Sequence, residues 1–115
     1  MAAWDPQTEF ATVARGFLDR PDVDAGTGFG GSPGVRVDGR IFAMLVRGRL
    51  VVKLPAARCA ELRDAGVAEP LAVGRRVMKE WIEVLAEDAA RWQELAEEAY
   101  EFAGGGPAVS SRAAS

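Results

Sequence analysis

The sequence predicts an α+β fold in which an antiparallel sheet of about five strands packs against three helices. The main observation is the stretch from Gly34 to Leu54, GVRVDGRIFAMLVRGRLVVKL, which has the pattern of three short strands joined by two tight turns. Apolar residues recur at helical spacing before this stretch and again near the end of the chain. The predicted order is therefore helix, three strands, helix, two strands, helix.

The chain has 115 residues, which is the size of one domain, and we expect that domain to cover residues 4–103. Residues 104–115 are small and polar and are predicted to form a disordered tail. With 49% hydrophobic and 27% charged residues, the composition is that of a soluble globular protein with a core of its own. A single cysteine, Cys59, and a start without a basic region followed by an apolar one favour a cytoplasmic location.

The first predicted helix begins at Asp5-Pro6, because aspartate is a frequent N-cap and proline is favoured at the first helical position. Its apolar stripe consists of Phe10, Val13, Ala14, Phe17 and Leu18. Pro21 follows the end of this helix. Residues 22–34 are then predicted to be a glycine-rich loop, which Phe29 anchors on the core.

The central stretch contains two turn signals. Asp38-Gly39 predicts a type I′ hairpin turn, which requires positive φ at both residues, and Arg47-Gly48-Arg49 predicts the second turn. The six apolar residues from Ile41 to Val46 indicate a central strand that is covered on both faces. Pro55 ends the third strand, because proline cannot donate a hydrogen bond to a strand ladder.

The segment Ala56 to Ala65 is predicted to be a short helix with Cys59 and Leu62 facing inward and Gly66 just after its end. Cys59 is expected to be buried and unreactive, because the chain has no histidine to activate it.

Glu69 to Val84 is predicted to be a second hairpin that turns at Gly74-Arg75-Arg76. On its second arm, Met78, Ile82 and Val84 are expected to share the buried face, and Trp81 to cover the other. Asp88 is the predicted N-cap of the last helix. The apolar stripe of that helix consists of Ala89, Trp92, Leu95, Ala96, Ala99, Phe102 and Ala103.

Several functional motifs are only partly present. Gly26 to Gly31 matches the spacing G-x-G-x-x-G, but a dinucleotide site needs a strand before it and a helix after it, and the sequence predicts neither. Asp22 to Gly26 begins like a calcium loop but lacks the remaining oxygen ligands. The absence of histidine excludes Ser-His and Cys-His catalysis and most zinc sites. We therefore expect no enzymatic activity, no cofactor and no metal.

The three predicted strands between Gly34 and Leu54 carry many cations, and Asp38 is the only acid in that stretch. The candidate interaction surface consists of Phe29, Arg36, Arg40, Arg47, Arg49, Lys53 and Trp81. One interpretation is contact with an anionic partner; the other is that cations on turns and edge strands prevent edge-to-edge aggregation. Against nucleic acid, the net charge is −3 and no aromatic residues alternate with these cations to form a base-stacking surface.

The chain resembles the N-terminal domain of the TfoX (Sxy) family from about Phe10 to Phe102. The residues that carry the resemblance are Phe29-Gly30-Gly31, Gly34, Asp38 to Ala43, Leu50 to Leu54 and Met78-Lys79-Glu80-Trp81. Gly28 departs from the family pattern, which has a methionine there, and the resemblance does not extend to a second domain. It implies a regulatory role through protein partners, linked in the founding members to DNA uptake.

Three functions follow as hypotheses. The first is a small non-enzymatic module, regulatory as in the TfoX family, that binds a protein partner or forms a homodimer through its sheet or its glycine-rich loop. The second is a nucleic-acid-binding protein that uses the cations of the central strands. The third is a small-ligand-binding protein or enzyme with a pocket under the glycine-rich loop. None of the three involves a membrane.

Overall fold

A computed structural model of the chain describes residues 4–28 and 31–104. The predicted α+β class is confirmed: three α-helices pack on one antiparallel sheet, and the sheet has six strands in the order β1-β2-β3-β4-β6-β5. The elements are α1 (Pro6–Leu18), β1 (Val23–Thr27), β2 (Pro33–Val37), β3 (Arg40–Val46), β4 (Arg49–Lys53), α2 (Ala56–Asp64), β5 (Ala68–Val73), β6 (Arg76–Val84), a 3₁₀ helix η2 (Ala86–Arg91) and α3 (Trp92–Phe102).

The strand that the sequence did not predict is β1, which lies inside the segment expected to be a loop. Its sequence, VDAGT, contains aspartate and glycine, both of which are rare in strands. β1 forms because it pairs along its whole length with β2, from Val23 opposite Val37 to Thr27 opposite Pro33. Phe29, the predicted anchor of this segment, lies outside the described residues, as does the predicted tail from residue 105 onward.

The two predicted hairpin turns are confirmed by their backbone angles. Asp38 and Gly39 have φ of 51° and 80°, and Arg47 and Gly48 have φ of 50° and 80°. Positive φ at both central residues is the geometry of type I′ turns, whose twist matches that of the flanking strands. These turns hold β2, β3 and β4 as consecutive neighbours.

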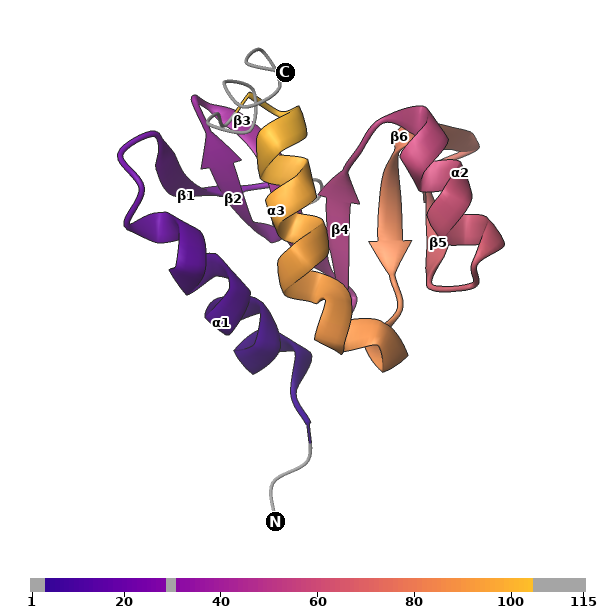
Figure 1. Cartoon of the computed structure of the whole chain (residues 1–115), viewed down its shortest axis with the longest axis horizontal. Coiled ribbons are helices and arrows are strands. Elements are labelled where there is room, and N and C mark those ends of the chain that lie inside the picture. Colours follow the sequence, from indigo (N-terminus) through magenta and orange to yellow (C-terminus); the bar gives the residue numbers. More distant parts are fainter. Residues whose placement is uncertain (1–3, 29–30, 105–115) are drawn as a thin grey trace, which may run out of the picture.

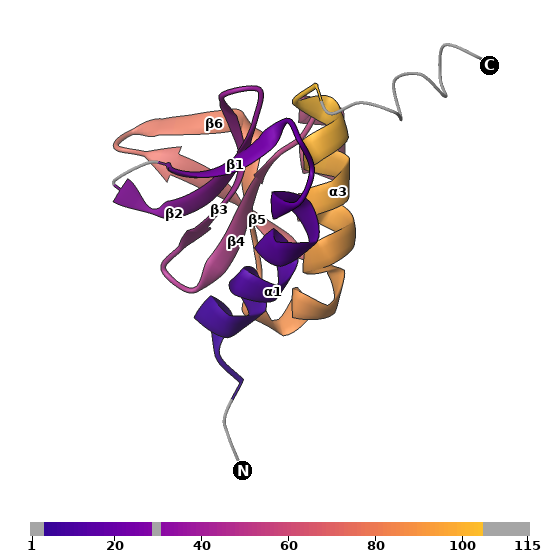
Figure 2. The same cartoon turned by 90° about the vertical axis from the view of Figure 1, so that its left-hand side faces the viewer.

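All three α-helices lie on the same side of the sheet, with α1 and α3 side by side (Figures 1 and 2). The core between helices and sheet contains the rings of Phe17, Phe42 and Tyr100, whose centroids are 5.2–5.6 Å apart. Phe42 reaches this core because β3 has a bulge there: Val35 pairs with Ala43, whereas Arg36 pairs with Ile41.

The helix starts were predicted with mixed success. Asp5 is the N-cap of α1, as expected, and its carboxylate accepts a hydrogen bond from the Thr8 amide at 3.2 Å. Asp88 is not the N-cap of the last helix, because it lies inside η2 with non-helical angles, and α3 begins at Trp92. Phe102, predicted to lie in the core, is 40% exposed at the end of α3.

The other face of the sheet carries no helix among the described residues, yet its centre is buried. Met44, Val51, Leu71 and Trp81 form a second apolar cluster there, with Ile41, Val46 and Met78 packed against it. In Figure 2 the β5–β6 hairpin extends away from the helices on this side of the molecule. The prediction that the central strand is covered on both faces is therefore confirmed.

A second irregularity in the sheet changes the faces of β6. Pro70 pairs with Ile82 and Leu71 pairs with Met78, so that three residues, Lys79–Trp81, lie opposite a single step of β5. Met78 consequently joins Trp81 on the helix-free face, and not Ile82 and Val84 as predicted from strict alternation.

None of the helices in the described part of the chain is long and apolar enough to cross a membrane.

Candidate functional site

Three of the predicted interaction residues form ion pairs with carboxylates on neighbouring strands: Arg36, Arg47 and Arg49. Arg36 on β2 contacts the Asp24 carboxylate on β1 through two nitrogens, and these hydrogen bonds raise the pKa of Arg36. Arg49 on β4 reaches Glu69 on β5 at 2.7 Å and Glu83 on β6 at 3.3 Å. Arg36 and Arg49 thus link neighbouring strands on the helix-free face of the sheet. The carboxylates that they bind already neutralise their positive charge.

Arg47 belongs to the same network but is held loosely. Its guanidinium is 3.4 Å from Glu83, and its side chain is 74% exposed. Glu83 itself is 8% exposed and lies directly opposite Glu69 on the neighbouring strand. The two carboxylates would repel one another without Arg49, which contacts both. These contacts indicate a structural role for Arg49.

The remaining predicted residues, Arg40, Lys53 and Trp81, come together at one end of the sheet. They line a pocket of about 370 Å³, together with Ile41, Glu80, Phe102 and Ala103. We call it the β3–β4 pocket, because it lies beside the start of β3 and the end of β4. Arg40 donates a hydrogen bond to the carbonyl of Ala103 at 3.0 Å and so fixes the end of α3 against the sheet.

A second hollow of about 500 Å³ adjoins the first and shares Lys53, Glu80 and Trp81 with it. We call it the β6 groove; its other lining residues are Ala56, Arg76, Val77, Met78 and Lys79. The groove lies along the irregular part of β6 described above. The Lys53 ammonium is 5.9 Å from the centroid of the Trp81 ring, which is within range of a cation–π contact.

The cations around the β6 groove lack the compensating carboxylates that Arg36, Arg47 and Arg49 have. Within the part of the chain that the structure describes, no carboxylate lies within ion-pair distance of Lys53, Arg76 or Lys79. Glu80 is the only acid in the lining. Val73 and Val77, on either side of the β5–β6 turn, are about half exposed at 50% and 51%. The region is therefore both cationic and apolar.

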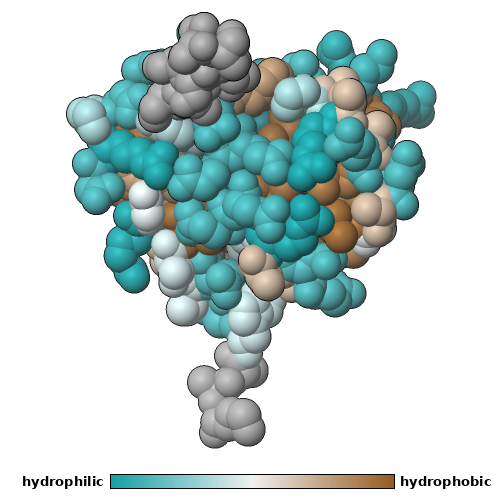
Figure 3. All heavy atoms as spheres, in the orientation of Figure 1, coloured by the Kyte–Doolittle hydropathy of each residue, from teal (hydrophilic) through white to brown (hydrophobic). Residues whose placement is uncertain are grey.

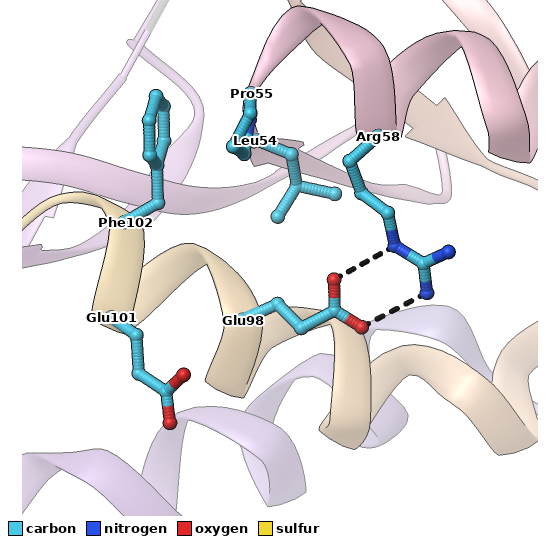
Figure 4. Close-up of a pocket in the computed structure, with 6 residues that line it drawn as sticks. All are labelled: Leu54, Pro55, Arg58, Glu98, Glu101 and Phe102. Atoms are coloured by element: carbon cyan, nitrogen blue, oxygen red, sulfur yellow. Dashed lines mark hydrogen bonds and ion pairs between the residues drawn. The ribbon is translucent and has the colours of Figure 1, made fainter. Parts of the chain in front are cut away.

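A third hollow, of about 390 Å³, lies between α2 and α3 (Figure 4). We call it the α2–α3 groove; it is lined by Leu54, Pro55, Arg58, Glu98, Glu101 and Phe102. Arg58 binds both oxygens of Glu98 at 2.9 and 3.0 Å and also reaches Glu61 at 3.0 Å. The bonds to Glu98, followed by that to Glu61, raise the pKa of Arg58.

The acidic character of this groove continues along α3. Glu94, Glu97, Glu98 and Glu101 form the outer side of the helix, which is hydrophilic in the space-filling view (Figure 3). Arginines compensate Glu94, Glu97 and Glu98. Glu101 forms no ion pair within the described residues and lies at the end of the helix beside Phe102.

Sequence reasoning missed Arg76, Lys79 and Phe102 as site residues. Arg76 was assigned only to a turn, Lys79 to a solvated strand face and Phe102 to the core. The signal available was the run of cations from Arg75 to Lys79 with no acid until Glu80. The sequence could not predict the irregularity in β6, because it arises from the register in which β5 pairs with β6.

The other candidate motifs have structural roles or remain incomplete. Cys59 is buried on α2, its thiol donates to the Leu54 carbonyl at 3.5 Å, and burial raises its pKa. Contrary to expectation, a strand, β1, runs into the G-x-G-x-x-G spacing and includes Gly26, but the next strand or α-helix in the chain is β2 and not the helix that a dinucleotide site needs. Across residues 4–28 and 31–104, no group of three or more His, Cys, Asp or Glu side chains could hold a metal ion.

Comparison with known proteins corrects the predicted kinship. A family model described as YjbR matches residues 18–102, which is most of the chain. The predicted membership of the TfoX family is therefore wrong, and with it the regulatory role that the resemblance implied. The residues that suggested it are turn glycines and apolar strand positions, which serve many antiparallel sheets. Searches of curated proteins and of solved structures found no match.

Proposed function

The chain belongs to the YjbR family, and we propose that it works by binding an acidic segment of a partner protein in the β6 groove. The observation that carries this proposal is the group of uncompensated cations, Lys53, Arg76 and Lys79, in a chain whose net charge is −3. Since the protein has an excess of acids and none of those described pairs with these three cations, the groove is suited to an anion.

The apolar part of the groove favours a peptide over a bare anion. Met78 and Val77 line it beside Trp81, so a segment that alternates acidic and apolar side chains can contact both kinds of surface. Lys53 is placed by its contact with Trp81, which reduces the entropy lost when it binds a carboxylate.

A protein partner fits better than nucleic acid for two reasons. Trp81 is 8% exposed and packed in the second apolar cluster, so it cannot serve as a platform on which bases stack. The net charge of −3 also disfavours a phosphate backbone that extends beyond the groove.

The proposal is one of binding and not of catalysis. The chain has no histidine, and the ionisable groups of the groove are three cations and the carboxylate of Glu80. This set suits recognition of charge but offers no paired acid and base for proton transfer. We also propose that the protein acts in the cytoplasm, where its free, buried cysteine would stay reduced.

Fluorescence anisotropy with labelled peptides tests the proposal. The probe is a short peptide in which glutamates flank a phenylalanine, and its matched control carries glutamines in their place. We expect the acidic peptide alone to bind, more weakly as salt rises, and the reversals Arg76→Glu and Lys79→Glu each to weaken it about tenfold.

The control variant is Arg63→Glu, which reverses an exposed cation on α2 that does not line the groove and has no ion pair with any described residue. It should bind the acidic peptide as the unmodified protein does. Equal binding of both peptides, equal effects of Arg63→Glu and Lys79→Glu, or tighter binding of a duplex oligonucleotide than of the acidic peptide would overturn the proposal.

A further inference from the structure

The α2–α3 groove and the β3–β4 pocket share one residue, Phe102, which lines both. They also meet where β4 ends, since Lys53 lines the pocket and the next two residues, Leu54 and Pro55, line the groove. Phe102 is therefore an aromatic side chain, 40% exposed, on the boundary between two neighbouring hollows.

The two hollows differ in charge. The α2–α3 groove has two carboxylates, Glu98 and Glu101, against the single guanidinium of Arg58, which is also shared with Glu61 outside the lining. The β3–β4 pocket has two cations, Arg40 and Lys53, against the carboxylate of Glu80. The surface around Phe102 is thus acidic on one side and basic on the other.

From this arrangement we infer that Phe102 lies at the centre of a two-fold interface between two copies of this chain. In a two-fold dimer, each copy presents the same patch to the other, and every contact occurs twice. An axis beside Phe102 places the acidic groove of one copy over the basic pocket of the second copy, and the reverse. A surface with opposite charges on either side of a shared aromatic residue is complementary to itself.

The chemistry at each part of this patch suits such a contact. An exposed aromatic ring at the centre of an interface supplies buried apolar area, and Pro55, which lines the same groove, adds to that area (Figure 4). Glu101 forms no ion pair within its own chain, as far as the described residues show, so it can bind the partner's cation without breaking an internal bond. Among the described residues, no carboxylate lies within ion-pair distance of Lys53 either.

The proposed peptide site shares Lys53 with this interface, but its test reverses Arg76 and Lys79, which line neither of the two hollows beside Phe102. A monomer could still bind the acidic peptide, and a dimer could still fail to bind it. The variants for the dimer are accordingly chosen from the two hollows beside Phe102.

Sedimentation equilibrium of the full chain at low salt, over a range of concentrations, provides the test. We expect a dimer whose dissociation constant rises by about tenfold or more in Glu101→Lys and in Lys53→Glu, because each change places two like-charged pairs across the axis. Mixing these two variants should restore the dimer, because both cross-axis pairs are then opposite in charge. Phe102→Ala should also weaken it.

The matched control for Glu101→Lys is Glu87→Lys, which makes the same change in net charge at an exposed residue outside both hollows. It should leave the dissociation constant within about twofold of the unmodified value. A chain that stays monomeric up to about millimolar concentration, or a dimer that Glu101→Lys and Phe102→Ala leave unchanged, would contradict the inference. So would a mixture of the two reversed variants that associates no better than either alone.

Discussion

Gly28 lies directly against the side chain of Met44, and a Cβ atom at Gly28 would overlap the Met44 sulfur. Met44 is fully buried on the face of the sheet that no described helix covers. Gly28, the first residue after β1, therefore lies against the second apolar cluster at close range. Glycine is needed at this position because any side chain would occupy the space that Met44 fills.

The first prediction concerns this contact. Gly28→Ala should destabilise the protein by about 1–3 kcal/mol, because the displaced Met44 must adopt a poorer conformation in a packed site. Urea denaturation measures the change. Gly16→Ala is the matched control: its Cβ would make an ordinary contact at 3.5 Å with Gln93, and replacing glycine within α1 should stabilise the protein by about 0.5–1 kcal/mol.

A double-mutant cycle isolates the contact itself. Met44→Ala alone should cost about 2–5 kcal/mol, because it leaves a cavity in the second cluster. In that background Gly28→Ala should cost clearly less than it does with Met44 in place. A cost that is the same in both backgrounds would mean that the two residues do not compete for space.

The second prediction concerns Arg49. Its guanidinium lies between Glu69 and Glu83, and Glu83 is mostly buried. Arg49→Leu should destabilise the fold by about 1–3 kcal/mol, because the Glu83 carboxylate then lacks its better-placed partner and faces Glu69. Urea denaturation of Arg49→Leu and of the double variant with Glu83→Leu provides the measurement, and the double variant should recover part of the loss.

Arg36→Leu is the comparison for Arg49→Leu, because Arg36 also bridges two strands on the same face but pairs with the exposed Asp24. It should change the denaturation midpoint far less than Arg49→Leu does. If the two variants were equally destabilised, the burial of Glu83 would not be what makes Arg49 important.

The third prediction concerns Cys59. Burial raises the pKa of its thiol, so the reactive thiolate is scarcer at pH 8 than in an exposed cysteine. The thiol should therefore react with a disulfide reagent only when urea unfolds the chain. Absorbance of the released thiol, with and without urea, gives the two rates. Fast labelling of the folded protein would show that α2 opens readily or that the thiol is accessible.

The sequence was most informative where local chemistry decides the structure. Asp38-Gly39 and Asp5-Pro6 were predicted correctly, because a turn with positive φ and an N-cap depend on a few adjacent residues. β1 was missed because its residues are poor strand formers and only their pairing with β2 holds them. Asp88 was misassigned because the chain forms a 3₁₀ helix there before Trp92 begins α3.

The functional surface was less predictable for a related reason. The sequence does not distinguish Arg36, Arg47 and Arg49 from Arg40 and Lys53. Only the strand register decides which of these side chains lies near a carboxylate. The run of six apolar residues in β3 predicted a strand covered on both faces, but not the bulge that turns Phe42 toward the helices. The chain was assigned to the TfoX family on turn glycines and apolar strand residues. Such residues are required by many antiparallel sheets and do not identify a functional site.

The outer strands restrict how any partner can attach. β5 carries Pro70, which has no amide hydrogen to donate, and its pairing with β6 is interrupted directly after that residue. At the opposite margin β1 is only five residues long and includes Asp24 and Gly26. Neither margin is therefore a good template for an added strand, and main-chain pairing with a strand of another molecule is disfavoured at both.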